Sequence, residues 1–228
     1  MALERFSLGF LETCDCGLVH LSGGPSWELS SNAGMSGLAF ALAVRESVDL
    51  PVYDADIPEP LIPAPAPMRL RLSRATRLAA AGQWASWWDL LVAQAAAGHI
   101  ERSGGAGRAP MWVADPPKFA SLAASPELQH IVTSALEPLR AWGESLEVPR
   151  DPVSNPVAGF VAHAESRLGR PVKPFAIRLE VLPVAGTRHW NVVLAPDLVR
   201  AHSLVSADFG TEPDRHGDWL VGVITQIG

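Results

Sequence analysis

Apolar positions recur with a helical period in the middle of the chain, and three of them are tryptophans. Trp84, Trp87 and Trp88 fall within about 100° of arc on one helix face. Each indole buries on the order of 150–250 Å², so this face must pack against the protein's own core or against a partner. Both alternatives stay open. The excess of indoles favours an interface, for which we predict Trp84, Trp87, Trp88 and Trp112 as partner-binding residues.

Two long helices are expected around this region. Ser73 is a good N-cap for the tryptophan helix, which we expect to run to about Ala97 and to stop at Gly98. Residues 125–127 (Ser-Pro-Glu) open a second helix with a cap, an early proline and an acid near the positive end of the dipole. Pro138 lies inside that second helix and predicts a kink or a break one turn upstream.

The remaining third of the chain predicts two more helices separated by strands. One helix follows Asn155-Pro156 and ends at Gly169, and the last follows residues 211–214. Between them the hydrophobic period changes from 3.6 to 2. Residues 175–182 alternate as a half-buried strand does, and 189–195 and 203–207 predict two more strands. We expect these three strands to form an antiparallel C-terminal meander.

The first 50 residues give weaker signals. Residues 6–11 and 17–21 predict two short strands, joined through 12–16, whereas the apolar run at 37–48 fits a buried helix or a strand equally well. The predicted fold class is therefore α+β, with an antiparallel sheet of three or more strands covered by at least four helices.

Prolines crowd residues 51–67, which excludes a helix or a central strand there. We expect this segment to be an extended strap across a single α+β domain that spans residues 1–228. The alternative is a linker between a small N-terminal subdomain, 1–50, and a main domain, 68–228.

Composition narrows the classes of partner and the compartment. The net charge of −6 argues against a general nucleic-acid-binding protein, although Arg69, Arg71, Arg74 and Arg77 form a local basic ridge. No apolar run is long enough to cross a bilayer, and no secretion signal is visible. Two cysteines in 228 residues fit a reducing compartment. We expect a cytoplasmic protein, and the scarcity of lysine beside abundant alanine and proline suggests a bacterial source.

The motifs of common enzyme families are missing: there is no P-loop, nucleophile elbow, dinucleotide fingerprint or H-E-x-x-H sequence. One weak metal pattern remains. Cys14, Cys16 and His20 carry the ligand types that zinc prefers, but their spacing is unusual and a fourth ligand is missing. We therefore predict no catalytic residue and no cofactor, with zinc at Cys14, Cys16 and His20 as the alternative.

Two further clusters carry polar chemistry. Asp54, Asp56 and Glu59 are carboxylates that can share a divalent cation. Near the C-terminus, histidines and aspartates lie at spacings that suit an acid–base pair in a pocket over the sheet. The residues of this second cluster are His189, His202, Asp208, Asp214, His216 and Asp218.

Two functions of different classes follow from these observations. The first is a non-catalytic bacterial interaction or accessory protein, an adaptor or an immunity-like protein, whose partner is another protein or a second copy. It rests on the acidic charge, the indoles and the proline-rich strap. The alternative is a small-molecule-binding protein or a metal-assisted hydrolase with its site near the C-terminal sheet.

Overall fold

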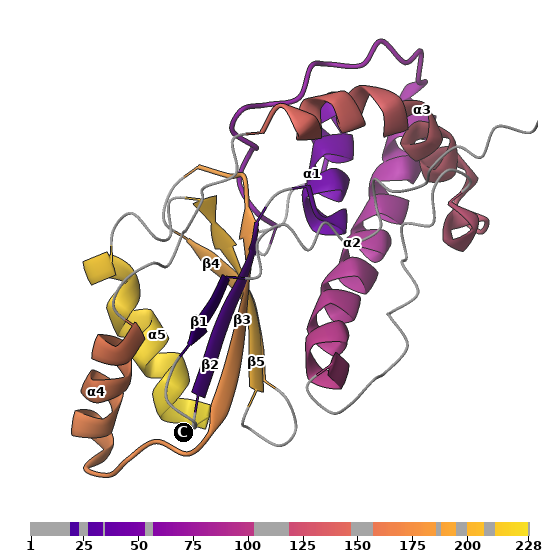
Figure 1. The fold of residues 1–228 in the computed structure, drawn as a ribbon. Coiled ribbons are helices and arrows are strands. Elements are labelled where there is room, and N and C mark those ends of the chain that lie inside the picture. The colour runs from indigo at the N-terminus through magenta and orange to yellow at the C-terminus, as the bar shows by residue number, and fades with distance from the viewer. Residues whose placement is uncertain are drawn as a thin grey trace, which may run out of the picture.

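The computed structural model describes residues 19–22, 27–33, 35–52, 57–102, 119–146, 157–185, 188–194, 200–207 and 213–227. Within these residues a five-stranded sheet is accompanied by five α-helices (Figure 1). The helices are α1 (Gly37–Ser47), α2 (Arg74–Arg102), α3 (Pro126–Glu144), α4 (Val157–Leu168) and α5 (Pro213–Ile227), with a short 3-10 helix at Ala120–Leu122. The strands are β1 (Val19–Ser22), β2 (Trp27–Ala33), β3 (Phe175–Leu182), β4 (His189–Leu194) and β5 (Arg200–Ser206).

The expected combination of helices with a sheet is confirmed, but the antiparallel meander is wrong. The strands lie in the order β1-β2-β3-β5-β4, so β5 separates β3 from β4. Because β4 returns the chain between them, β3 and β5 run in the same direction and pair as parallel strands. β2 also runs parallel to β3, whereas β1 and β4 are antiparallel to their neighbours. The sheet is therefore mixed.

Strand β2 was not expected from the sequence, although it lies inside the sheet between β1 and β3. Its residues are Trp-Glu-Leu-Ser-Ser-Asn-Ala, in which Leu29 is the one large apolar residue at a buried position. Without an apolar alternation the period-2 signal is lost. Downstream of β2, residues 37–47 form a helix rather than a strand, and the strand expected at 17–21 corresponds in part to β1. The strand expected at 6–11 lies outside the described residues.

Two groups of helices take opposite sides of the sheet (Figure 1). Helices α4 and α5 lie side by side and bury one apolar core against the sheet, to which Leu29, Ile177, Leu179 and Val205 contribute. Helices α1, α2 and α3 contact one another and enclose a second core around Trp84 and Trp87. Among the described side chains, Leu182, Trp190 and Leu204 of the sheet belong to this second core, together with Val184 just after β3.

Helix ends agree in part with the sequence expectations. Ser73 caps α2 as expected, because its Oγ accepts the Thr76 N–H at 3.0 Å. The stop at Gly98 is wrong, since α2 continues to Arg102. A glycine ends a helix by adopting the left-handed conformation, and the structure records that conformation at Gly169, which follows α4. Pro138 does not break α3, which is continuous; Pro138 is exposed, where water can solvate the carbonyl that its ring leaves free.

The cap expected from Ser125 is also wrong, because its side chain makes no capping hydrogen bond to α3. Gln83 of α2 takes over this role. Its Oε1 accepts the Leu128 N–H at 2.9 Å, and its Nε2 donates to Glu127 Oε2 at 2.6 Å. The hydrogen bond from Gln83 lowers the pKa of Glu127. One amide side chain therefore fastens the start of α3 to α2.

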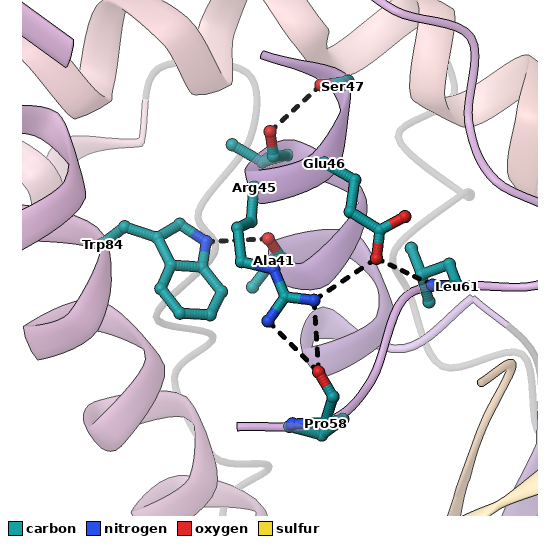
Figure 2. A network of polar contacts seen from close by, with 8 residues as sticks. Ala41, Arg45, Glu46, Ser47, Pro58, Leu61 and Trp84 are labelled. Carbon is teal, nitrogen blue, oxygen red and sulfur yellow. Dashed lines mark hydrogen bonds and ion pairs between the residues drawn. The ribbon is translucent and has the colours of Figure 1, made fainter. Parts of the chain in front are cut away.

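The described part of the proline-rich segment is extended and fastened at several points. Both terminal nitrogens of Arg45 donate to the carbonyl of Pro58 at 3.2 Å, and Glu46 Oε1 accepts the Leu61 N–H at 2.7 Å (Figure 2). Trp142 Nε1 of α3 donates to the carbonyl of Pro63 at 3.1 Å. Leu61 also forms a β-bridge with Val184. This segment therefore joins α1, α3 and the end of β3.

Candidate functional site

The two faces of the sheet differ in chemistry, and the strand β3 shows it best. Its residues Phe175, Ile177, Leu179 and Val181 belong to the core under α4 and α5. Because side chains alternate along a strand, Arg178 and Glu180 lie on the opposite face. Glu180 is only 4% exposed. The half-buried strand expected from the sequence is thus covered on both sides, and its second face carries charge.

The neighbouring strands extend this second face across the sheet. Ser30 of β2 and His202 of β5 are the register partners of Arg178 on its two sides, and residues directly opposite one another share a face of the sheet. His202 is 1% exposed and Ser30 is 2% exposed, whereas Arg178 is partly exposed. We call Ser30, Arg178, Glu180 and His202 the polar face.

The polar face combines groups that burial normally penalises. A buried charge is costly unless it is paired and hydrogen-bonded, so an apolar face would stabilise the fold at lower cost. Arg178 offers a guanidinium that binds carboxylate or phosphate through two parallel hydrogen bonds. His202 is the residue type that exchanges a proton near neutral pH, and Glu180 offers acceptor oxygens. The polar face therefore contains the types of group that anion binding and proton exchange require.

A second polar network surrounds Arg45 at the end of α1 (Figure 2). Besides Pro58, the guanidinium contacts Glu46 at 3.3 Å and lies 5.6 Å from the centre of the Trp84 ring. Burial lowers the pKa of Arg45, which the neighbouring Glu46 partly offsets. Arg45, Glu46 and Asp49 also line a hollow of about 560 Å³ under the proline-rich segment. Because Arg45 already binds Pro58 and Glu46, we assign this network to holding that segment in place.

The tryptophan stripe lies inside the protein's own core. Trp84, Trp87 and Trp88 are 0%, 1% and 2% exposed. Trp84 stacks on Trp88 with ring centres 5.5 Å apart, and its Nε1 donates to the carbonyl of Ala41 at 2.7 Å. These contacts supply the packing that three indoles on one face require. The fourth residue predicted to bind a partner, Trp112, lies outside the described residues.

The predicted metal ligands are only partly described. Cys14 and Cys16 lie outside the described residues, and His20 is in β1, where Ser30 is its register partner. No group of three or more His, Cys, Asp or Glu side chains within the described part of the chain is arranged to hold a metal ion. Asp54 and Asp56 are not described, and Glu59 forms an ion pair with Arg188.

The C-terminal histidines and aspartates are distributed over different places. His202 lies on the polar face, but His189 is at the edge of the sheet, where its ring stacks on Trp219 at 4.6 Å. Asp218 is exposed on α5. Asp208 is not described, and nothing is described of the Asp214 and His216 side chains. Of this cluster, His202 lies on one face of the sheet with Arg178 and Glu180. Arg178 and Glu180 were not predicted as site residues from the sequence.

No helix in the described residues is long and apolar enough to span a membrane. No family model matches the chain, and no curated protein or solved structure matches it either. The side chains of the described residues are therefore the basis for a proposed function.

Proposed function

We propose that this chain binds a small anionic molecule on the polar face of its sheet. The observation that carries the proposal is that the buried Glu180 and His202 lie with the partly exposed Arg178 on one face of the adjacent strands β3 and β5, whose other face is largely apolar. Arg178 and His202 supply the positive and donor groups for the anion. Glu180 accepts a hydrogen bond from a hydroxyl or amino group of the same ligand.

The partial exposure of Arg178 supports this assignment. A ligand needs a route to the site, and Arg178 connects the buried His202 and Glu180 with the solvent. Charged side chains gathered in a site of low exposure are also typical of functional positions. The proposal concerns binding.

Thermal unfolding in the presence of simple anions tests the proposal. The probes are inorganic phosphate, acetate and citrate, each compared with sodium chloride at the same ionic strength. A ligand that binds only the folded chain raises its stability by about 2.7 kcal/mol at a concentration of 100 Kd. We expect at least one probe to raise the melting temperature.

Variants assign that rise to the polar face. Arg178→Gln and His202→Gln should abolish the rise, whereas Arg167→Gln, at an exposed arginine of α4, should keep it. The proposal fails if no probe acts beyond sodium chloride, or if the Arg178→Gln protein responds like the unchanged chain.

Association with another protein is the second function we propose, and one observation favours it. The helix α2 buries its indoles but exposes Leu78 and Leu90 on its other side. Since the three indoles lie in the core, this surface is a better basis for association than the tryptophan stripe.

A further inference from the structure

The outer side of α2, over residues 74–97 whose side chains the structure describes, is an apolar surface with one exposed charge of each sign. Leu78 and Leu90 are 54% and 57% exposed and are two of the three large apolar residues exposed in the described part of the chain. Between and around them the exposed positions are small or polar: Ala75, Ala79, Gly82, Ser86, Ala93 and Ala97. At 100° per residue all of these fall on one side of the helix. Arg74 and Asp89 are the exposed charged residues along it.

The two charges are placed symmetrically about Gly82. Arg74 lies eight residues before Gly82 and Asp89 seven residues after it, which corresponds to about 12 Å and about 10.5 Å along the helix axis. Neither side chain takes part in an ion pair within the described residues, where Arg77, by contrast, binds Asp49 at 3.4 Å. A surface whose positive and negative ends lie at similar distances from its centre is complementary to a second copy of itself that runs in the opposite direction.

We infer that the outer side of α2 binds a second copy of this chain, with the two α2 helices antiparallel and crossing near Gly82. A two-fold axis at Gly82 places Arg74 of each copy beside Asp89 of the other, on the same side of the helix pair. Leu90 of one copy then lies over Ala75 of the other, so that a large side chain meets a small one, as ridges-into-grooves packing requires. Leu78 lies at the same height as Ser86 of the other copy, on the opposite side of the helix pair.

Gly82 suits the crossing point. A Cβ built on it would meet no atom within 4 Å in the chain, so the space in front of it is open to the second helix. The charge pairing also selects the antiparallel orientation, because a parallel pair would bring Arg74 next to Arg74 and Asp89 next to Asp89. The two copies therefore form a closed dimer with a single isologous interface.

A charge exchange tests the pairing, with the dimer dissociation constant measured by sedimentation equilibrium on the full chain. We expect the unchanged protein to dimerise. Arg74→Asp and Asp89→Arg should each weaken the dimer by about tenfold or more, since each opposes two pairs of like charges, and the double variant should recover most of the loss. Asp218→Arg, at an exposed aspartate of α5, is the matched control and should change nothing.

Cross-linking tests the geometry independently. In a chain with Cys14 and Cys16 replaced by serine, a cysteine at Gly82 lies on the two-fold axis and should form an intermolecular disulfide under mild oxidation. A cysteine at Ala97, 15 residues away on the same side, should not. A monomer at concentrations of several hundred micromolar overturns the inference. So does a charge exchange without recovery, or a disulfide at Ala97 in place of Gly82.

Discussion

The two faces of the sheet are made by alternate residues of the same strands, but they meet their helices differently. Under α4 and α5 the face is apolar along its length, from Phe175 to Val181. On the side of α1 to α3 the same strand presents Arg178 and Glu180, and apolar contact resumes only at Leu182. The face of β3 under α4 and α5 therefore has the composition of a protein core along the whole strand, whereas the opposite face has that composition only at the C-terminal end, at Leu182.

This difference separates the positions that stabilise the fold from the positions for which we propose a binding function. Burying apolar surface contributes about 25 cal/mol per Å², and the α4–α5 side uses nearly every position for it. Burying Glu180 and His202 brings no such gain and adds a desolvation cost. The core of α1 to α3 is closed largely by its own helices, with Phe40, Trp84 and Ile131 inside. The stability of the fold therefore does not require apolar side chains at the positions of the polar face.

The largest expected effect contrasts two neighbours on β3. Leu179→Ala should lower the free energy of unfolding by about 2–5 kcal/mol, because it leaves a cavity at a position with 0% exposure. Glu180→Gln keeps the side-chain volume one residue further on and should cost less. Urea unfolding of the two variants measures both. If Glu180→Gln costs as much as Leu179→Ala, the carboxylate is a structural element and the contrast between the faces disappears.

A smaller effect distinguishes two indoles in the core of α1 to α3. Trp84 Nε1 donates to Ala41, whereas the buried Trp87 Nε1 has no acceptor among the described residues. Replacement by phenylalanine removes a similar ring from each, but only Trp84→Phe loses a hydrogen bond. We expect Trp84→Phe to cost about 1–2 kcal/mol more than Trp87→Phe. Equal losses in urea unfolding would mean that packing alone fixes these rings.

The sequence predicted the helices well because their signals are local. The stripe of α2, the Ser73 cap and the Gly169 end follow from residues a few positions apart. The order of the strands is not local. An alternating pattern shows that β3, β4 and β5 are strands, but it does not show that β5 lies between the other two. The meander was the simplest arrangement and the structure differs from it.

The candidate site was harder to predict for a related reason. Alternation with Arg178 and Glu180 predicts a strand with one side in water, because charged residues are mostly exposed. Only the burial of Glu180 on one face and of Leu179 on the other shows that both faces of β3 are covered. Strand β2 was missed because Ser30 and Ser31 interrupt its apolar pattern, although both are buried. Ser30, which lies on the polar face, is thus one of the two residues that obscure the strand.

The smallest expected effect concerns His189, a titratable residue at the edge of the apolar face. Its ring stacks on Trp219 of α5, and burial lowers its pKa from the ordinary value of 6.5. The unfolded chain keeps the ordinary value, so below it the unfolded state binds more protons at this position than the folded state. The contribution of His189 to stability is therefore fully present above pH 6.5. It is lost as the pH falls through the lowered pKa.

A variant isolates this contribution from the other six histidines. His189→Gln keeps a planar polar side chain but does not titrate, so the unchanged chain should lose more stability than this variant between about pH 7.5 and about pH 5.5. Urea unfolding of both proteins at the two pH values gives the difference. An identical loss in both would mean that the ring titrates as it does in the unfolded chain. The contact with Trp219 would then not remove the His189 ring from water. The apolar face of the sheet would in that case not extend to β4.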